Sequence, residues 1–544
     1  MNKVYNTVWN ESIGMWVVTS ELTRKGGQRP RQIRRTVLAG LVAGLLLPSA
    51  PTLATAWDSV TLGSGGTSGS MTLNAGDTAN NTTINSGGQQ YVSSGGSATS
   101  TTINSGGEQY VSNGGSATST TINSGGRLSV FNGSAVDITQ NSGGAISTDT
   151  SSDLSGANAK GSFSIAGGSA NNMLLENGGY LMVLDGHQAS DTTVGSYGTL
   201  GVVSGGSATS TTINSGGWQA VYSGGSATST TINSGGQLSV FSGSAVDITQ
   251  NSGGAIETDT SSDLSGTNAK GSFSIAGGSA NNMLLENGGS LMVLDGHQAS
   301  DTTVGSYGTL GVVSGGSATS TTINSGGRQH VSGGGSATST TINSGGVQNV
   351  NDGGSATSTT INSGGWQTVN DGGSATSTTI NSGGWQTVNN GGSATSTTIN
   401  NGGEQYVYSN GSATSTTVNN GGWQNVFSSG SATSTTINSG GRQHVSGGGS
   451  ATSTTINSGG WQVVSSGGSA TSTTINGGRQ DVFSGGSATS TTINGGLQVV
   501  SSGGSATSTT INSDGWQDVN DGGSATSTTI NSGGGQAVNS GGSA

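Results

Sequence analysis

The sequence Gly353–Asp371, GGSATSTTINSGGWQTVND, is one clear copy of a unit that recurs along most of this 544-residue chain. The unit is 19 residues long, and its core SATSTT occurs 16 times, first at Ser97 and last at Ser524. A fixed period of this length is typical of solenoid proteins, in which each repeat forms one coil and buries its apolar face only against its neighbours. Periodicity therefore indicates an ordered rod, although an aromatic content of 4% would otherwise suit a disordered chain.

Each unit predicts two short β-strands separated by glycine-rich turns. The first strand is ATSTTIN, in which Thr340 and Ile342 share one face. The second strand is WQTV, in which Gln367 and Val369 share the face opposite Trp366. With the NSGG and NDGG turns between them, these strands complete one coil, so we expect an all-β solenoid, a β-helix with ladders of identical residues.

Two shorter units support this interpretation. Both are 18 residues long, and both lack the Ser of the NSGG turn, at Asn476-Gly477-Gly478 and at Asn494-Gly495-Gly496. A deletion within a strand would turn every following side chain to the wrong face, whereas a deletion in a corner need not. The sequence thus predicts a stack of 18–19-residue coils whose strand register survives these deletions.

Charge and composition exclude several classes of function. Residues 1–56 hold 7 of the 13 Lys and Arg residues but 2 of the 25 Asp and Glu residues, so the remainder has a formal net charge of −17. An acidic body of this kind makes nucleic acid and anionic membranes poor partners. The chain has no cysteine, which excludes disulfides and thiolate metal sites.

The N-terminus predicts export from the cytoplasm. The apolar run Val37–Leu47 follows a basic segment that includes Arg35, and the small-residue pattern Ala54-Thr55-Ala56 comes after it. Eleven apolar residues are too few to span a bilayer, so we expect an extended signal peptide over residues 1–56, cleaved after Ala56.

The remaining organisation follows from the repeats. Residues 97–206 recur almost verbatim as 207–316, and each copy contains a more apolar block that we expect to continue the solenoid with longer corners. We therefore expect four regions: the signal peptide (1–56), the start of the exported body (57–96), a tandem 110-residue duplication with irregular coils (97–316) and regular 19-residue repeats (317–544).

One cluster of ionisable residues could carry chemistry. Asp185, His187 and Asp191 lie close in sequence, and the duplication repeats them as Asp295, His297 and Asp301. They could form an acid/base pair or a weak metal site, but a solvated corner that contains a histidine is the interpretation we favour. We expect no enzyme, no cofactor, and no catalytic or metal-binding residues.

Six tryptophans share the slot that follows the NSGG turn or its variants. Because Glu, Arg, Val, Leu, Gln and Gly also occur in this slot, its side chains should point outward. Exposed Trp and Arg residues favour intermolecular contacts, and a tolerant solvent-facing position is the alternative. The candidate contact surface consists of Trp218, Trp366, Trp385, Trp423, Trp461 and Trp516.

Three features together resemble one protein family. They are the opening stretch MNKVYNTVWNESIGMWVVTSELTRKGG, the SATSTTINSGG units and the block NNMLLENGG…LDGHQASDT. They resemble the exported passengers of self-associating, AIDA/TibA-type autotransporter adhesins of Gram-negative bacteria, over essentially the whole chain. The resemblance implies a right-handed parallel β-helix on the outer membrane that mediates autoaggregation, biofilm formation and attachment to host cells. Its partners would be a second passenger and the host-cell surface.

The resemblance further implies O-glycosylation by a dedicated heptosyltransferase. Candidate acceptors are the Ser of GGSA and the Ser of NSGG: Ser97, Ser116, Ser207, Ser226, Ser317, Ser336, Ser355, Ser374, Ser393, Ser344, Ser363 and Ser382. The family also has an outer-membrane barrel, which does not occur in this sequence. Because the sequence stops two residues into another unit, at Ser543-Ala544, we expect it to be truncated before that barrel.

Alternative functions remain open from the sequence. The rod could be a passive structural stalk, or its Thr-rich TSTT strands could form the flat threonine surface of an ice-binding solenoid. The second alternative requires exposed Thr ladders, whereas Thr340 is expected to face inward with Ile342.

Overall fold

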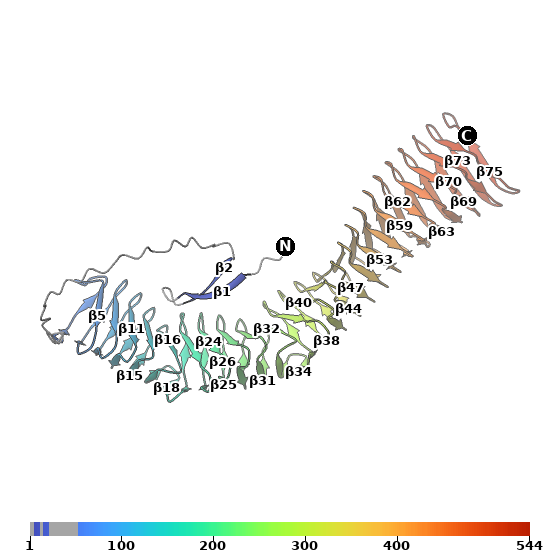
Figure 1. Ribbon diagram of the computed structural model, residues 1–544. Coiled ribbons are helices and arrows are strands. Elements are labelled where there is room, and N and C mark those ends of the chain that lie inside the picture. The colour runs from blue at the N-terminus through green and yellow to red at the C-terminus, as the bar shows by residue number, and fades with distance from the viewer. Residues whose placement is uncertain (1–4, 11–14, 21–52) are drawn as a thin grey trace, which may run out of the picture. The chain divides into compact units, whose positions relative to one another are not determined.

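The structure is a computed structural model that describes residues 5–10, 15–20 and 53–544. It divides into two units, Met1–Leu53 and Ala54–Ala544, coloured along the chain in Figure 1. In the first unit, strand β1 (Tyr5–Asn10) pairs antiparallel with β2 (Met15–Ser20). The apolar run at 37–47 lies outside the described residues. Every described element is a strand, so this part of the chain contains no apolar helix long enough to cross a membrane.

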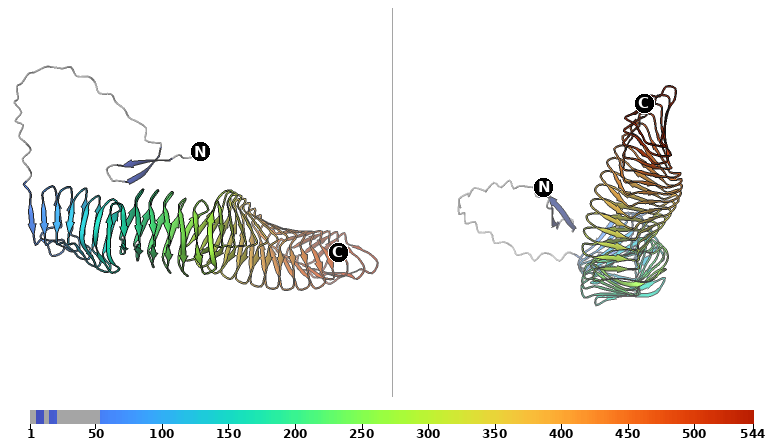
Figure 2. Two further views of the ribbon diagram at one scale, coloured as in Figure 1. Left: turned by 90° about the horizontal axis from the view of Figure 1, so that it is seen from below. Right: turned by 90° about the vertical axis from the view of Figure 1, so that its right-hand side faces the viewer.

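The second unit is a stack of about 25 coils with a spacing of about 19 residues. Each regular coil contributes three strands, for example β47 (Ser355–Thr357), β48 (Thr360–Ile361) and β49 (Trp366–Val369). Each strand pairs in parallel with its equivalent one coil later, so that Ser355 lies opposite Ser374. The predicted parallel β-helix is confirmed, and Figure 2 shows the successive strands side by side.

The three strands of each coil build three ladders along the rod. The first ladder runs from β3 (Ala56–Asp58) to β74 (Ser524–Thr526), and the second from β4 (Thr61–Leu62) to β75 (Thr529–Ile530). The third runs from β5 (Ser70–Leu73) to β76 (Gly535–Val538).

The expectation of two strands per coil is wrong, because the ATSTTIN segment bends. Ser358 separates β47 from β48 and has a φ of 56°, in the left-handed region. The side chains of Ala356 and Ile361 are both buried, although they are five residues apart. An unbroken strand would place residues at an odd spacing on opposite faces, so the bend at Ser358 is what allows both to enter the core.

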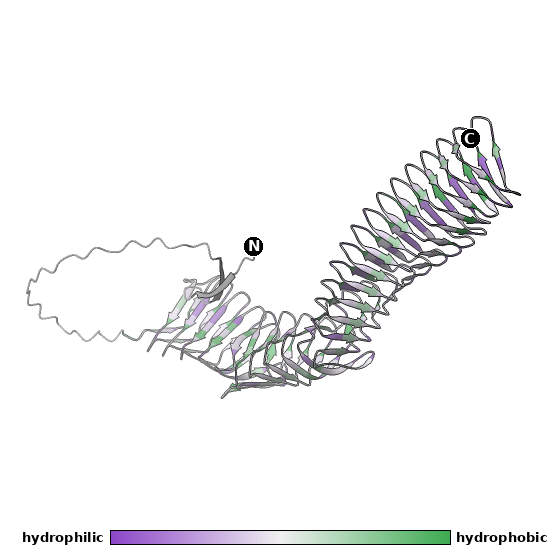
Figure 3. Ribbon diagram, turned by 45° about the vertical axis from the view of Figure 1, so that its right-hand side comes forward, coloured by the Kyte–Doolittle hydropathy of each residue, from purple (hydrophilic) through white to green (hydrophobic). Residues whose placement is uncertain are grey.

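The interior is part apolar and part polar. In a regular coil, Ala356, Thr359, Ile361, Gln367 and Val369 are buried, with exposures of 0–1%. The predicted inward faces are therefore confirmed. Figure 3 shows both hydrophobic and hydrophilic segments on the strands that enclose this interior.

Buried glutamines and threonines satisfy one another along the stack. The Nε2 of Gln367 donates to Gln348 Oε1 at 2.7 Å and to Thr359 Oγ1 at 3.3 Å. The Oγ1 of Thr378 in turn donates to Gln367 Oε1 at 3.3 Å. Because buried polar groups are costly only when unpaired, this ladder gives a narrow solenoid a stable interior without large apolar residues.

A row of asparagine side chains holds the NSGG corners together. The Nδ2 of Asn362 donates to Asn343 Oδ1 at 2.9 Å, and Asn381 repeats this contact to Asn362 at 3.0 Å. The corner also needs its last glycine, because a Cβ on Gly365 would lie 2.7 Å from the carbonyl oxygen of Ile342. At this corner the backbone of the preceding coil leaves no room for a side chain.

The shorter coils keep the strand register. On either side of the first shortened corner, Ile456 lies opposite Ile475 and Trp461 lies opposite Arg479. The prediction that a corner deletion leaves the strand faces unchanged is confirmed.

The irregular blocks contain an added antiparallel strand instead of the longer corners expected there. Strand β18 (Gly161–Ala166) pairs antiparallel with both β17 (Asp153–Asn158) and β19 (Ser169–Asn171), within the first ladder. In the third ladder, β16 (Ala145–Asp149) pairs directly with β21 (Tyr180–Val183). The chain thus reverses twice within one ladder before the regular stack resumes, and the duplicated block repeats this arrangement.

Candidate functional site

The outward side of the third ladder carries most of the exposed aromatic residues of the regular repeats. In its four-residue strands, the second and fourth residues point inward, and the first and third residues lie on the outward side. We define the aromatic face as the outward side chains of seven consecutive strands and the residues that follow them: β49 (Trp366–Val369), β52 (Trp385–Val388), β55 (Glu404–Val407), β58 (Trp423–Val426), β61 (Arg442–Val445), β64 (Trp461–Val464) and β67 (Arg479–Val482).

The structure places all six predicted tryptophans in this outward slot, four of them on the aromatic face. Trp366 is 45% exposed, and Trp385 and Trp423 are each 39% exposed. Trp461 is half-buried. The other two, Trp218 and Trp516, lie elsewhere on the third ladder with exposures of 39% and 45%.

Cation–π contacts fix part of the face. The guanidinium of Arg442 lies 5.0 Å from the ring centroid of Trp423 and 5.0 Å from that of Trp461, one coil to either side. Arg479 lies 5.9 Å from the same Trp461 ring. Such contacts are worth about 0.5–1 kcal/mol each at exposed sites, so together they restrict the orientation of both indoles.

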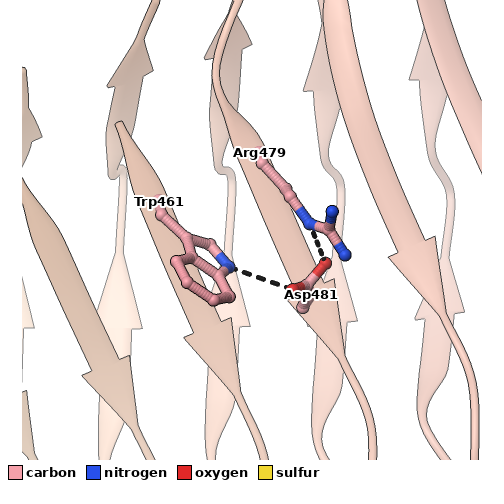
Figure 4. Close-up of polar contacts among 3 residues, drawn as sticks. All are labelled: Trp461, Arg479 and Asp481. Atoms are coloured by element: carbon pink, nitrogen blue, oxygen red, sulfur yellow. Dashed lines mark hydrogen bonds and ion pairs between the residues drawn. The ribbon is translucent and has the colours of Figure 1, made fainter. Parts of the chain in front are cut away.

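Asp481 joins two of these residues, as Figure 4 shows. The Nε1 of Trp461 donates to Asp481 Oδ2 at 3.0 Å, and the Nε of Arg479 donates to Asp481 Oδ1 at 2.7 Å. The Asp481 side chain is 11% exposed while that of Arg479 is 50% exposed, so solvent screens the ion pair. The contact therefore acts mainly to hold the Trp461 indole in place.

Two adjoining hollows open on the aromatic face. The first has a volume of about 410 Å³ and is lined by Glu404, Tyr406, Trp423, Asn425, Phe427, His444 and Ser446. The second has a volume of about 370 Å³ and is lined by Trp366, Trp385, Thr387, Tyr406, Tyr408 and Phe427. Because Tyr406 and Phe427 line both, the hollows lie side by side along the rod.

Aromatic contacts shape these walls. The rings of Trp366 and Trp385 meet edge to face at 6.1 Å, and those of Tyr408 and Phe427 stack at 5.1 Å. The Tyr406 hydroxyl donates to Glu404 Oε2, and this hydrogen bond is the main reason why the pKa of Tyr406 rises to about 12. At neutral pH the first hollow therefore presents a protonated phenol beside the Glu404 carboxyl group.

The candidate glycosylation serines lie at the surface on other parts of the coil. The GGSA serines, such as Ser355, begin the strands of the first ladder and are partly exposed, and the NSGG serines, such as Ser363, are exposed at corners. Sequence reasoning missed a third exposed series, the serines at the bend between the first two strands, such as Ser358. The odd spacing of buried Ala356 and Ile361 was the signal that could have located them. Which serines carry sugar stays a prediction.

The structure does not gather the Asp185, His187 and Asp191 cluster into a metal site. The Nδ1 of His187 lies 2.8 Å from Thr150 Oγ1, and Asp191 occupies a left-handed position with a φ of 52°. The duplicated His297 makes the same contact with Thr260 at 2.8 Å. Over residues 53–544 and the two N-terminal strands, no three His, Cys, Asp or Glu residues are placed to hold a metal ion.

Ala56 begins strand β3, which pairs with β6 (Thr78–Asn80). Cleavage after this residue would leave Trp57 as the first residue of the rod. The cleavage position itself stays a prediction.

Comparison with known proteins gives family matches. The model described as "adhesin of bacterial autotransporter system, probable stalk" matches residues 58–107, 155–217, 265–327, 323–365, 361–403, 399–441 and 430–478, more than half of the chain. The model of the extended signal peptide of type V secretion systems matches residues 1–50.

Curated relatives match shorter stretches. Autotransporter CRAC of Citrobacter rodentium is 64% identical over 209 residues, 35% of this chain and 13% of the relative. The autotransporter adhesin/invasin TibA of Escherichia coli O78:H11 is 66% identical over 92 residues, 17% of this chain and 9% of the relative. Among solved structures, a TibC-catalysed hyper-glycosylated TibA fragment has 55% identity and a TM-score of 0.47, and the match covers 48% of this chain and 98% of the fragment. The chain thus spans a small part of the length of the two curated relatives.

Proposed function

We propose that the rod of this chain, which belongs to the family of AIDA-type autotransporter adhesin stalks, mediates bacterial autoaggregation, biofilm formation and attachment to host cells. The extended signal peptide and the autotransporter relatives indicate export and display at the bacterial surface. The observation that carries the proposal is the aromatic face, because it presents exposed Trp and Arg side chains on successive coils.

The proposed mechanism is multivalent. Stacked coils repeat nearly the same outward side chains, so two rods, or a rod and a host surface, can form many weak contacts at once. A body of net charge −17 repels a second copy, which means that aromatic contacts and hydrogen bonds between Asn, Ser and Thr side chains must supply the attraction. The self-association of this chain would therefore depend on the number of coils.

Glycosylation is part of the proposal. The GGSA and NSGG serines lie at the surface of the folded rod, where attached sugars would extend into solvent, and a solved TibA fragment is described as hyper-glycosylated by TibC. We expect a heptosyltransferase to modify this chain on some of these serines before export. A role without catalysis agrees with this assignment to an adhesin family.

The passive-stalk alternative lacks a use for the exposed tryptophans. The ice-binding alternative needs a flat, exposed threonine surface. Thr359 is 1% exposed, and the bend at Ser358 lies between the outward Thr357 and Thr360. These features do not favour the ice-binding alternative.

A sedimentation assay tests the proposed self-association. Bacteria would display residues 57–544 on a heterologous outer-membrane barrel, with and without a co-expressed heptosyltransferase. We expect rapid settling that excess soluble passenger inhibits. Cells that remain dispersed in both strains, at equal surface levels of the rod, would contradict self-association and leave host attachment to be measured on epithelial monolayers.

A further inference from the structure

We propose that the two adjoining hollows of the aromatic face bind a neutral oligosaccharide. The inference rests on the proposed adhesin function, because it names the class of surface molecule that the rod contacts. The ligand is a short chain of uncharged pyranose sugars that lies along the rod across both hollows.

The residues around the hollows suit both sides of a sugar ring. A pyranose has an apolar face of C–H groups that packs on aromatic rings and an edge of hydroxyl groups that form hydrogen bonds. Trp366, Trp385 and Tyr408 supply aromatic surface in the second hollow. Glu404, Asn425 and His444 add a carboxylate, an amide and an imidazole beside the Trp423 ring in the first. An apolar wall with a few polar groups that converge on it is typical of small-molecule sites.

The geometry of the solenoid sets the spacing of these groups. Strands in one ladder lie about 4.8 Å apart, so outward side chains on successive coils recur at nearly the length of one sugar unit in an extended β-linked glycan. Tyr406 and Phe427 line both hollows, so their side chains form the boundary across which a bound oligosaccharide would pass. Volumes of about 410 and 370 Å³ fall in the range of small-molecule sites, roughly 300–1,000 Å³.

The walls are held in position without a ligand. Arg442 lies between the rings of Trp423 and Trp461, and Tyr408 stacks on Phe427. The Tyr406 hydroxyl is bonded to Glu404 within the first hollow. Preorganised walls reduce the ordering cost of binding, which matters for weak ligands such as sugars.

Charge favours a neutral ligand. Arg442 and Arg479 are already engaged with tryptophan rings and Asp481, whereas Glu404 lines the first hollow. An anionic glycan would meet this carboxylate and a body of net charge −17. We therefore assign the hollows to a neutral glycan.

The test measures binding and aggregation on the same cells. Bacteria without the heptosyltransferase would display residues 57–544, and flow cytometry would record binding of fluorescent chitohexaose and cellohexaose, with a sialylated hexasaccharide as the anionic probe. We expect saturable binding of at least one neutral probe, inhibited by the unlabelled sugar. Trp423→Ala and Tyr406→Ala should each weaken it at least about tenfold, equivalent to about 1.4 kcal/mol, while Trp423→Phe should retain part of the affinity.

Trp218→Ala is the matched control. Trp218 occupies the same slot, is as exposed as Trp423 at 39%, and does not line either hollow, so its loss should leave sugar binding unchanged. No saturable binding of a neutral probe, an equal loss in Trp218→Ala, or binding of the anionic probe with similar affinity would overturn the inference. The inference would also be overturned if glycosylated passenger inhibited probe binding and the unlabelled sugar did not.

Settling of the same cells separates this inference from the proposed function. Cells that settle but bind no sugar would contradict only the carbohydrate site. Cells that bind sugar but stay dispersed would contradict only self-association.

Discussion

At the scale of single residues, the buried glutamine ladder is the most sensitive part of the rod. Gln405 Oε1 accepts from Gln424 Nε2 at 2.8 Å and from Thr416 Oγ1 at 3.3 Å, and its Nε2 donates to Gln386 at 2.7 Å. Gln405→Leu would leave the Gln424 amide and the Thr416 hydroxyl buried and unpaired. Gln386 Oε1 would keep the hydrogen bond that Thr397 donates to it. We expect a loss of about 1–3 kcal/mol in the free energy of unfolding, measured by denaturant titration with circular dichroism.

The reverse substitution provides the control for this prediction. Leu200 occupies the position that a buried glutamine holds in the regular coils, and it lies opposite Gln219. Three buried groups near it lack hydrogen-bond partners: the hydroxyls of Thr192 and Thr211 and the Nε2 of Gln219. Leu200→Gln would supply an acceptor for Gln219 and Thr211 and a donor for Thr192. We expect it to be neutral or stabilising, and a loss as large as that of Gln405→Leu would contradict the ladder account.

Alkaline pH tests another single residue. The hydrogen bond that Tyr406 donates to Glu404, together with burial and the nearby charge, raises the pKa of Tyr406 to about 12. The folded chain holds this proton more tightly than the unfolded chain, in which a tyrosine titrates near pH 10, so the stabilisation is complete below about pH 10 and is lost as pH rises to about 12. Phenolate absorbance should show a late-titrating tyrosine that Tyr406→Phe removes, whereas Tyr110, bonded to Glu108 in the same way, should still titrate late. A normal titration in this range would contradict the contact.

At the scale of the element, the bend in each coil depends on a left-handed serine. Ser358 has a φ of 56°, which glycine adopts freely and a β-branched residue strongly resists. We expect Ser358→Val to lower stability by about 1–2 kcal/mol and Ser358→Gly to have little effect, as judged from thermal unfolding. Equal effects of the two substitutions would show that the bend does not depend on backbone conformation at this position.

This bend also shows how far the sequence could predict the fold. The period, the inward Gln367 and Val369 and the outward Trp366 followed from the repeat, because ladders place identical residues in identical environments. The added strand Gly161–Ala166 did not follow, since the irregular block departs from the 19-residue unit and its two copies repeat the same departure. The tryptophan slot was predictable too, whereas the hollows were not, because Tyr406 and Phe427 meet other side chains only after neighbouring coils are stacked.

At the scale of the whole molecule, the duplication allows the number of coils to be changed without a change in any junction. Deletion of residues 207–316 joins Gly206 to Ser317, the same residue pair that Gly316 and Ser317 form now. Strand Thr199–Val202 would then pair with Arg328–Val331, as the identical Thr309–Val312 does at present. Because each coil contacts only its neighbours, the shortened rod should unfold at nearly the same temperature.

The same deletion separates the two proposed activities. It removes residues that lie outside the aromatic face, so binding of a neutral oligosaccharide per displayed rod should be unchanged. Autoaggregation should fall by more than the share of coils removed, because avidity multiplies the contributions of individual contacts. Deletion of residues 207–306, which is not a whole copy of the duplication, should disrupt the ladders and expose the rod to protease. Settling that is unchanged in the 207–316 deletion would show that self-association depends on a local site, and that the coils removed only extend the rod from the cell surface.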